Sequence, residues 1–239
     1  MFFGSGYFQA TLHPWIAGSF VLALLFGYEL GVRLSSAGDD LPWRTGLDAG
    51  LRLLLRQRGS SSLEWLPSAV LGVSLLCYSC RRWKERPRQS IETWSAMMVE
   101  SILLALPLLL LARLCGAEAI TSIAPEDSAR NTSRALLLAS IGAGVYEEVM
   151  FRWFLISCLI VLLRGVGLEW GWRLSLAWGL SAFLFALAHH LPPFQEPYHK
   201  TVFLFRFLAG AYFALLYWFR GLGIAAGVHA CYDMMAMMN

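Results

Sequence analysis

Long apolar runs separated by short polar connections dominate the pattern along the chain. A helix that crosses the hydrocarbon core of a bilayer needs about 20 mostly apolar residues. About seven segments approach that length, and the fourth is long enough to be tilted or kinked. The segments are Trp15–Val32, Leu66–Cys80, Ala96–Cys115, Arg134–Leu163, Leu174–Leu191, Val202–Phe219 and Leu222–Met238. The pattern predicts an all-α, polytopic transmembrane helix bundle.

The connection Leu34–Trp65 is polar overall but carries leucines interspersed with arginines. This pattern suits a helix that lies at the membrane interface, with arginines reaching the lipid headgroups. A solvated loop is the alternative interpretation, and the sequence favours neither. The residues before Pro14 lack the basic region and small-residue cleavage site of a signal peptide. We therefore expect the first apolar segment to remain as a transmembrane helix.

The composition agrees with exposure to lipid. Hydrophobic residues make up 57% of the chain and charged residues 15%, whereas an ordinary globular domain has about 45–50% and about 25%. The mean hydropathy is +0.55. The formal net charge of +3 is mild, and the arginines form no stripe with exposed aromatic residues. We expect a multi-pass integral membrane protein, in the plasma membrane if its source is bacterial, that contacts the lipid bilayer and no nucleic acid.

Ionisable residues inside the apolar segments carry the candidate chemistry. A charge at the bilayer centre costs about 2.5–3.5 kcal/mol on insertion scales, so such a residue is usually paired, hydrated or functional. Glu148 and Arg152 of the fourth segment are four residues apart and can pair on one helix face. Glu147 points about 100° away, and its carboxylate is suited to act as a general base. The alternative is a structural ion pair beside an interfacial glutamate.

Two later segments carry histidines. His189 and His190 end the fifth segment just before a proline, and adjacent helical residues point about 100° apart, so we expect only one to face the bundle interior. His229 and Asp233 share a helix face, and a carboxylate beside an imidazole can fix its tautomer. Each could instead be a hydrogen-bonded core residue. Because helices bury polar groups toward each other rather than toward lipid, we expect these groups to converge in one cavity.

Other ionisable residues in the apolar segments favour a structural role. Glu29 and Glu100 lie near predicted helix ends, where their carboxylates are expected to reach the headgroups. Arg206 lies one turn into its segment, and its long side chain is expected to extend outward to the interface.

Three short motifs follow one another on successive apolar segments: Glu147-Glu148-x-x-x-Arg152, Phe185-x-x-x-His189 and His229-x-x-x-Asp233. In order and spacing they resemble the signature of the CAAX protease and bacteriocin-processing family (CPBP, also called Abi), whose best-known branch is the type II CAAX prenyl endopeptidase. The resemblance covers Ser133 to Asn239. We therefore expect N-terminal transmembrane segments and loops over 1–132 and a CPBP-like catalytic helix bundle over 133–239.

The resemblance implies a glutamic-type intramembrane endopeptidase that uses no cofactor and cuts a membrane-anchored protein or peptide. It implies that Glu147 activates water with help from His189. It also implies that Glu148 and Arg152 hold the first motif in place. His229 and its partner four residues later would bind the oxyanion of the tetrahedral intermediate.

The last motif departs from the family pattern. Many members have Asn where this chain has Asp233. An amide can donate a hydrogen bond to an oxyanion, whereas an ionised carboxylate cannot. Asp233 is therefore either protonated, or it orients His229 and leaves the donor role to that imidazole. We favour the second interpretation.

Two other functions stay open from the sequence. His189, His229 and a glutamate could bind Zn²⁺, as in an intramembrane metalloprotease, although the two-histidine motif H-E-x-x-H is missing. A transporter or an immunity protein could use the same cavity to hold an ion or a peptide. An ion pathway usually carries polar residues along most of its length, whereas here they cluster at one depth, which favours a reaction centre.

Overall fold

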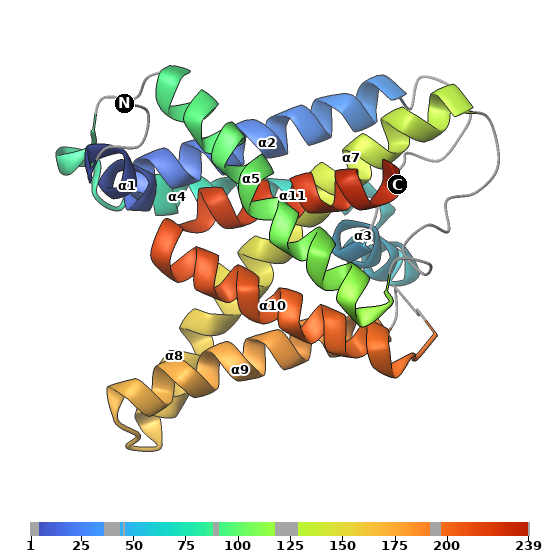
Figure 1. Cartoon of the computed structure of the whole chain (residues 1–239). Helices are drawn as coiled ribbons and strands as arrows, with labels where there is room; N and C mark the ends of the chain where they lie inside the picture. Colours follow the sequence, from blue (N-terminus) through green and yellow to red (C-terminus); the bar gives the residue numbers. More distant parts are fainter. Residues whose placement is uncertain are drawn as a thin grey trace.

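The computed structural model describes residues 5–35, 44, 46–87, 91–117, 129–191 and 197–238, and within these ranges every regular element is a helix (Figure 1). The helices are α1 (Ser5–Leu12), α2 (Pro14–Ser35), α3 (Gly46–Gln57), η1 (Ser61–Leu63), α4 (Leu66–Cys80), η2 (Trp83–Glu85), α5 (Ile91–Cys115), α7 (Ala129–Glu148), η3 (Val149–Leu155), α8 (Ile156–Gly165), α9 (Trp170–Ala188), α10 (Lys200–Arg220) and α11 (Leu222–Met238).

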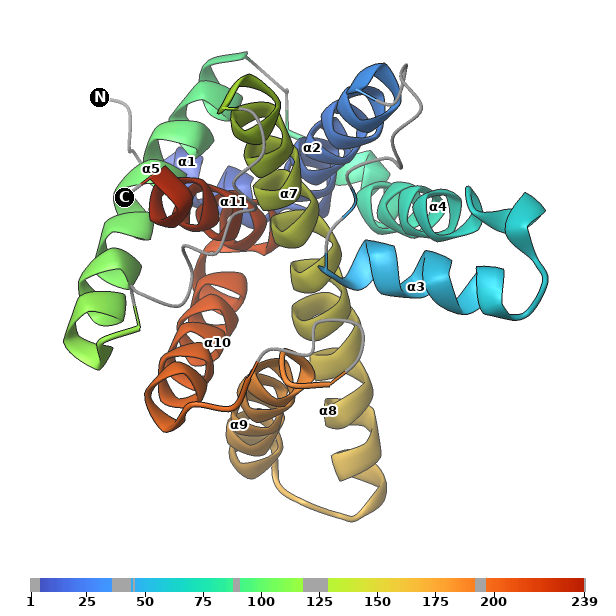
Figure 2. The same ribbon diagram turned by 90° about the vertical axis from the view of Figure 1, so that its right-hand side faces the viewer.

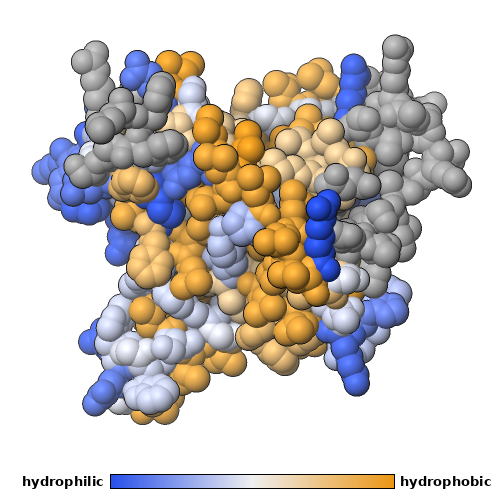
Figure 3. All heavy atoms as spheres, in the orientation of Figure 1, coloured by the Kyte–Doolittle hydropathy of each residue, from blue (hydrophilic) through white to orange (hydrophobic). Residues whose placement is uncertain are grey.

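By length and composition, the helices α2, α5, α9 and α10 can each cross a membrane, while α4 and α11 are shorter apolar helices. Large apolar side chains lie on the outside of the bundle, and orange apolar surface covers much of the face in Figure 3. Leu114 and Phe26, for example, are 77% and 70% exposed. An apolar surface of this extent needs lipid around it. The predicted all-α transmembrane bundle is confirmed.

The predicted fourth segment is one continuous helix that runs from α7 through η3 into α8. The turns of η3 are π-helical, and the backbone stays helical on both sides, with φ −68° and ψ −37° at Glu148 and φ −59° and ψ −42° at Ile156. The span therefore changes its winding instead of breaking. A π segment inside an α-helix is frequently found at a functional site, and this one begins directly after Glu148.

Helix α11 forms the centre of the bundle, where it packs against α2, α5, α7 and α10 (Figure 1). Its residues from Leu222 to Tyr232 are buried. Gly144 of α7 allows a close approach of the two backbones: a Cβ atom there would lie 2.6 Å from the carbonyl oxygen of Ala226 and 2.8 Å from the amide nitrogen of Ala230. Small residues that allow two backbones to touch are typical of transmembrane helix contacts. This contact sets the end of α7 against the middle of α11.

Within the segment Leu34–Trp65 the structure describes the helix α3, so part of it is helical rather than a loop, and its position at the membrane interface stays a prediction. Not all of its arginines reach headgroups, however, because Arg52 is only 7% exposed and its Nε donates to Asp48 at 2.7 Å. A buried guanidinium is destabilising unless a counter-charge pairs with it, and Asp48 supplies that charge. The proposed boundary between 1–132 and 133–239 stays a prediction. Helices α2 and α5 from the first part pack directly on α11 from the second part.

Gly144→Ala is expected to lower the free energy of unfolding by about 1–3 kcal/mol, because the new methyl group forces two backbones apart. The thermal unfolding midpoint of the detergent-solubilised protein measures the effect. Gly179→Ala in α9 is the matched control, since a Cβ atom there meets nothing within 4 Å and alanine is the better helix former. Equal midpoints for the two variants would contradict the close α7–α11 contact.

Candidate active site

The structure brings the predicted site residues from three parts of the chain into one cluster. The end of α7 and η3 supplies two carboxylates and a guanidinium, the end of α9 one imidazole, and α11 an imidazole and a carboxylate. Their exposed fractions are 3% for Glu147, 0% for Glu148, 0% for Arg152, 4% for His189 and 5% for His229, and 20% for the side chain of Asp233. The cluster is thus enclosed by protein, with Asp233 at its more open side.

Glu148 joins two helices through its carboxylate. Its Oε1 atom lies 2.7 Å from Nδ1 of His229, and its Oε2 atom lies 3.1 Å from Nε of Arg152. Ion pairs to a guanidinium favour the ionised carboxylate, which can only accept hydrogen bonds. Nδ1 of His229 is therefore the donor. This arrangement fixes the tautomer of His229 and turns its Nε2 atom toward Glu147.

Arg152 is fully buried, and several groups offset its charge. Besides the carboxylate of Glu148, its Nη2 donates to the carbonyl oxygen of Gly210 in α10 at 3.3 Å. The guanidinium carbon lies 4.3 Å from the ring centroid of Phe185 and 5.3 Å from that of Phe213. Aromatic faces attract a cation, and more strongly when water is absent. Arg152 therefore ties η3 to α9 and α10 and holds Glu148 in position.

His189 is fixed by its own helix. Its Nδ1 atom lies 2.8 Å from the carbonyl oxygen of Phe185, and a carbonyl can only accept, so Nδ1 carries the proton. The Nε2 atom then faces Glu147. The expected inward histidine of the adjacent pair is thus His189, while His190 turns away and stacks on Phe203 with 5.8 Å between ring centroids.

Glu147 lies between the two oriented imidazoles. Its Oε2 atom is 3.8 Å from Nε2 of His189 and 3.9 Å from Nε2 of His229. These distances exceed a direct hydrogen bond and are of the length that a water or another small polar group commonly bridges. The same Nε2 atom of His229 is 3.6 Å from Oδ2 of Asp233. One carboxylate and two imidazole nitrogens therefore surround a single point.

Arg206 of α10 is a site residue that sequence reasoning missed. The expected outward extension is wrong, because its Nε atom is buried and the guanidinium interacts electrostatically with Glu147 and His189. Helix α10 has no acidic residue that could pair with Arg206 along its own length. The sequence signal that could have identified it is a cation in an apolar helix that contains no acidic residue, which points to a counter-charge on another helix.

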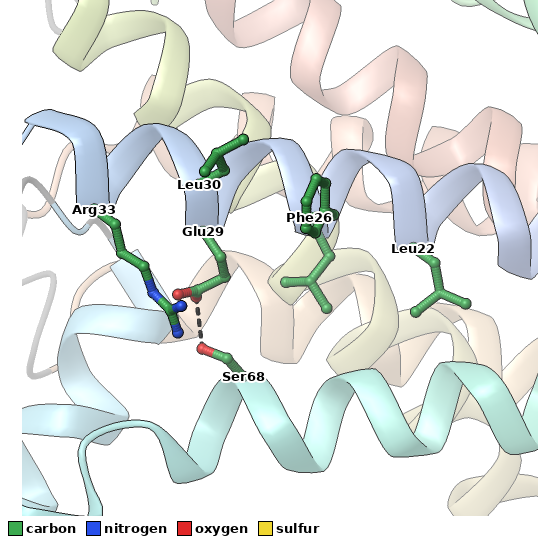
Figure 4. A pocket seen from close by; sticks show the side chains of 7 residues that line it. Leu22, Phe26, Glu29, Leu30, Arg33 and Ser68 are labelled. Carbon is green, nitrogen blue, oxygen red and sulfur yellow. Dashed lines mark hydrogen bonds between the residues drawn. The ribbon is translucent and has the colours of Figure 1, made fainter.

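The two glutamates expected at the headgroups are instead ion-paired inside the protein. Glu100 lies 2.6 Å from Nε of Arg220 and accepts a hydrogen bond from the hydroxyl of Tyr7, also at 2.6 Å. Glu29 pairs with Arg44 at 3.0 Å and accepts a hydrogen bond from Ser68, as Figure 4 shows. Near a helix end, a guanidinium from a neighbouring segment was the closer partner in both cases.

The network around Glu29 reaches helix α7, which carries Glu147. Ser68 lies within 2.9 Å of the hydroxyl of Tyr146, which directly precedes Glu147. On its other side, Asp48 of α3 accepts hydrogen bonds from Tyr28 and Arg44, both at 2.7 Å. Helices α2, α3 and α4 are therefore tied to α7 next to the cluster. In the ranges that the structure describes, no group of three or more His, Cys, Asp or Glu residues is arranged to hold a metal ion.

The fold and the buried cluster define a membrane-embedded helix bundle with a carboxylate–imidazole centre. The family model for type II CAAX prenyl endopeptidase Rce1-like proteins matches residues 130–235, so this part of the chain is similar to that family. The matched region contains all the residues of the cluster. The similarity points to a protease, which is a hydrolase of peptide bonds, and together with the apolar helices it points to an integral membrane protein. No curated protein and no solved structure matches the chain.

Arg152→Met is expected to lower the free energy of unfolding by about 3–5 kcal/mol, because it leaves the carboxylate of Glu148 buried without its cation. The double variant Arg152→Met/Glu148→Gln is expected to recover part of that loss, since a neutral amide needs no counter-charge. Thermal unfolding of the single and double variants in detergent gives the coupling between the two positions. A double variant whose loss equals the sum of the two single losses would show that the residues do not interact.

Proposed function

We propose that the protein is an intramembrane endopeptidase that hydrolyses a peptide bond near the membrane interface of a membrane-anchored protein or peptide, without a cofactor. The observation that supports this most is the position of Glu147. Its Oε2 atom lies 3.8 and 3.9 Å from two Nε2 atoms, and the opposite nitrogen of each ring is held by a hydrogen bond. A water molecule at that point meets a base and two oriented imidazoles in a site closed to bulk solvent.

In the proposed mechanism, Glu147 acts as the general base. Its carboxylate takes a proton from the water while the water oxygen attacks the carbonyl carbon of the scissile bond. His189, with its proton fixed on Nδ1, presents the Nε2 lone pair that orients the second hydrogen of the water. Glu147 then returns the proton to the leaving amine nitrogen, so that the carbon–nitrogen bond breaks and the carboxylate is regenerated.

His229 is the proposed oxyanion donor. Its Nδ1 donates to Glu148, so Nε2 can donate only when the ring carries a second proton. The carboxylates of Glu148 and Asp233 lie at 2.7 and 3.6 Å from the two ring nitrogens and offset a positive charge on the imidazole. A preorganised donor in a dry site contributes about 2.7–4 kcal/mol of barrier lowering. In this proposal Glu148 orients the ring, and Asp233 supports its charge.

The setting of the reaction is proposed from the same features. The substrate is a membrane-associated protein or peptide, because an enclosed site among lipid-facing helices is reached through the bilayer. The plasma membrane is the proposed location if the protein is bacterial, with lipid as the surrounding partner and no nucleic acid involved.

Glu147→Gln is expected to abolish proteolysis, because an amide cannot take a proton from water. Mass spectrometry of membrane-protein termini in cells that carry the wild type or the variant detects the loss as uncleaved termini. His190→Asn is the matched control, since the neighbouring ring faces away from the cluster, and it is expected to keep wild-type cleavage. If cells with Glu147→Gln show the same cleaved termini as cells with the wild type and keep full biological function, a transporter or immunity protein is favoured instead.

The zinc alternative rests on the same convergence of Glu147, His189 and His229, which supply the ligand types of a catalytic zinc site. The purified wild type, treated with a chelator and analysed for bound metal, separates the two mechanisms in the same assay. Full activity without metal is expected. Stoichiometric zinc, together with activity that is lost on chelation and restored by Zn²⁺, would establish a metalloprotease.

Asp233→Asn is expected to keep cleavage within about tenfold of the wild type, because an amide N–H can donate directly to the oxyanion. His229→Asn is expected to cost about 10²–10³ in kcat, the usual effect of removing an oxyanion donor. Steady-state cleavage of one substrate identified from the terminal analysis measures both. Asp233→Ala, which has neither the charge nor the amide, is measured as a reference. If Asp233→Asn loses as much activity as Asp233→Ala, the negative charge of Asp233 is required for cleavage.

A further inference from the structure

An apolar groove of about 600 Å³ lies on the other face of the helix that carries the cluster. Its walls come from the amphipathic helix α3, from α4 and from η3, and they include Leu51, Leu54, Val70, Met150 and Trp153. In Figure 2 the α7–η3–α8 helix has α3 and α4 on one side and α5, α10 and α11 on the other. The groove is therefore separate from the buried carboxylate–imidazole centre.

One arginine side chain borders the groove and is available to bind a ligand. Arg58, just after the end of α3, lines the groove and is exposed, and among the described residues its side chain has no ion-pair or hydrogen-bond partner. The two preceding arginines differ. Arg52 is buried against Asp48, and Arg56 pairs with Glu64 at 2.6 Å, a hydrogen bond that lowers the pKa of Glu64.

The volume and charge of the groove indicate which kind of ligand it can bind. Its volume lies within the range of small-molecule sites, roughly 300–1,000 Å³, and its lining is almost wholly apolar apart from Arg58, Ser74 and the hydroxyl of Tyr146. An exposed guanidinium binds phosphate through paired hydrogen bonds. We propose that the groove binds one acyl chain of an anionic phospholipid whose phosphate contacts Arg58. The proposal goes beyond the peptidase activity.

The groove has a fixed wall, which favours binding. Asp48 of α3 accepts hydrogen bonds from Tyr28 of α2, Arg44 and Arg52, each at 2.7 Å. These bonds fix α3 against the rest of the bundle. Meanwhile Leu54 and Val70 remain 57% and 56% exposed. A preformed apolar wall orders fewer groups when a chain binds, and so loses less entropy.

Photolabelling tests the headgroup. The full-length protein in nanodiscs is irradiated with phosphatidylglycerol that carries a diazirine in its acyl chain, or with the matching phosphatidylcholine, and labelled peptides are mapped by mass spectrometry. We expect phosphatidylglycerol to label residues 47–58, 66–74 and 149–154 several-fold more than phosphatidylcholine does. Arg58→Gln is expected to remove that preference, and Arg56→Gln to keep it. Equal labelling by both lipids in the wild type would overturn the proposal.

A pair of groove variants tests the chain site. Val70→Trp fills the groove and is expected to abolish its labelling by phosphatidylglycerol. Val73→Trp, at a position that is 60% exposed and lies on the same helix away from the groove lining, is expected to leave the labelling unchanged. Labelling that is spread evenly over the bundle, or that persists in Val70→Trp, would show ordinary surrounding lipid and overturn the proposal. The labelling reads binding directly, so its result is independent of whether Glu147 is catalytic.

Discussion

The buried carboxylate of Glu148 is the interaction on which the rest of the site depends. It accepts from His229 at 2.7 Å and pairs with Arg152 at 3.1 Å, and all three side chains are buried away from bulk solvent. Desolvation of the ions is offset only while all the partners are in place. The same contacts orient the imidazole and fix η3 against α10 through Gly210. Stability and preorganisation of the site therefore have one physical cause.

This interaction requires helices that approach closely. Gly144 allows the backbone of α7 to touch α11 at Ala226 and Ala230, and without that contact a glutamate side chain could not reach His229 with such a short hydrogen bond. The hydrophobic effect contributes little to the association of helices in lipid. Close packing of small residues and polar contacts must therefore stabilise that association. Sequence positions with no chemistry of their own thus determine where the reactive groups meet.

The sequence predicts those parts of the site that are local. Spacing by four residues places Glu148 beside Arg152 and His229 beside Asp233, and apolar periodicity predicts the helices. The contact from Glu148 to His229 spans 81 positions and depends on crossing angles and small-residue contacts that periodicity does not encode. The inward direction of Arg206 and the π-helical winding of η3 are likewise set by tertiary packing. A residue's type shows that it needs a partner, while the fold decides which one.

The N-terminal helices lie outside the residues that the family model matches, and yet their side chains form hydrogen bonds with helix α7. The hydroxyl of Tyr146 meets Ser68 of α4 and, at 3.4 Å, Glu29 of α2, one residue before Glu147. Helix α7 is thus held from both faces, by α11 and Arg152 on the side of the cluster and by a buried ionic network on the other. A general base, which is the role proposed for Glu147, must keep its position to within a fraction of an ångström. Two opposed sets of polar contacts constrain rotation of the helix more strongly than apolar packing alone.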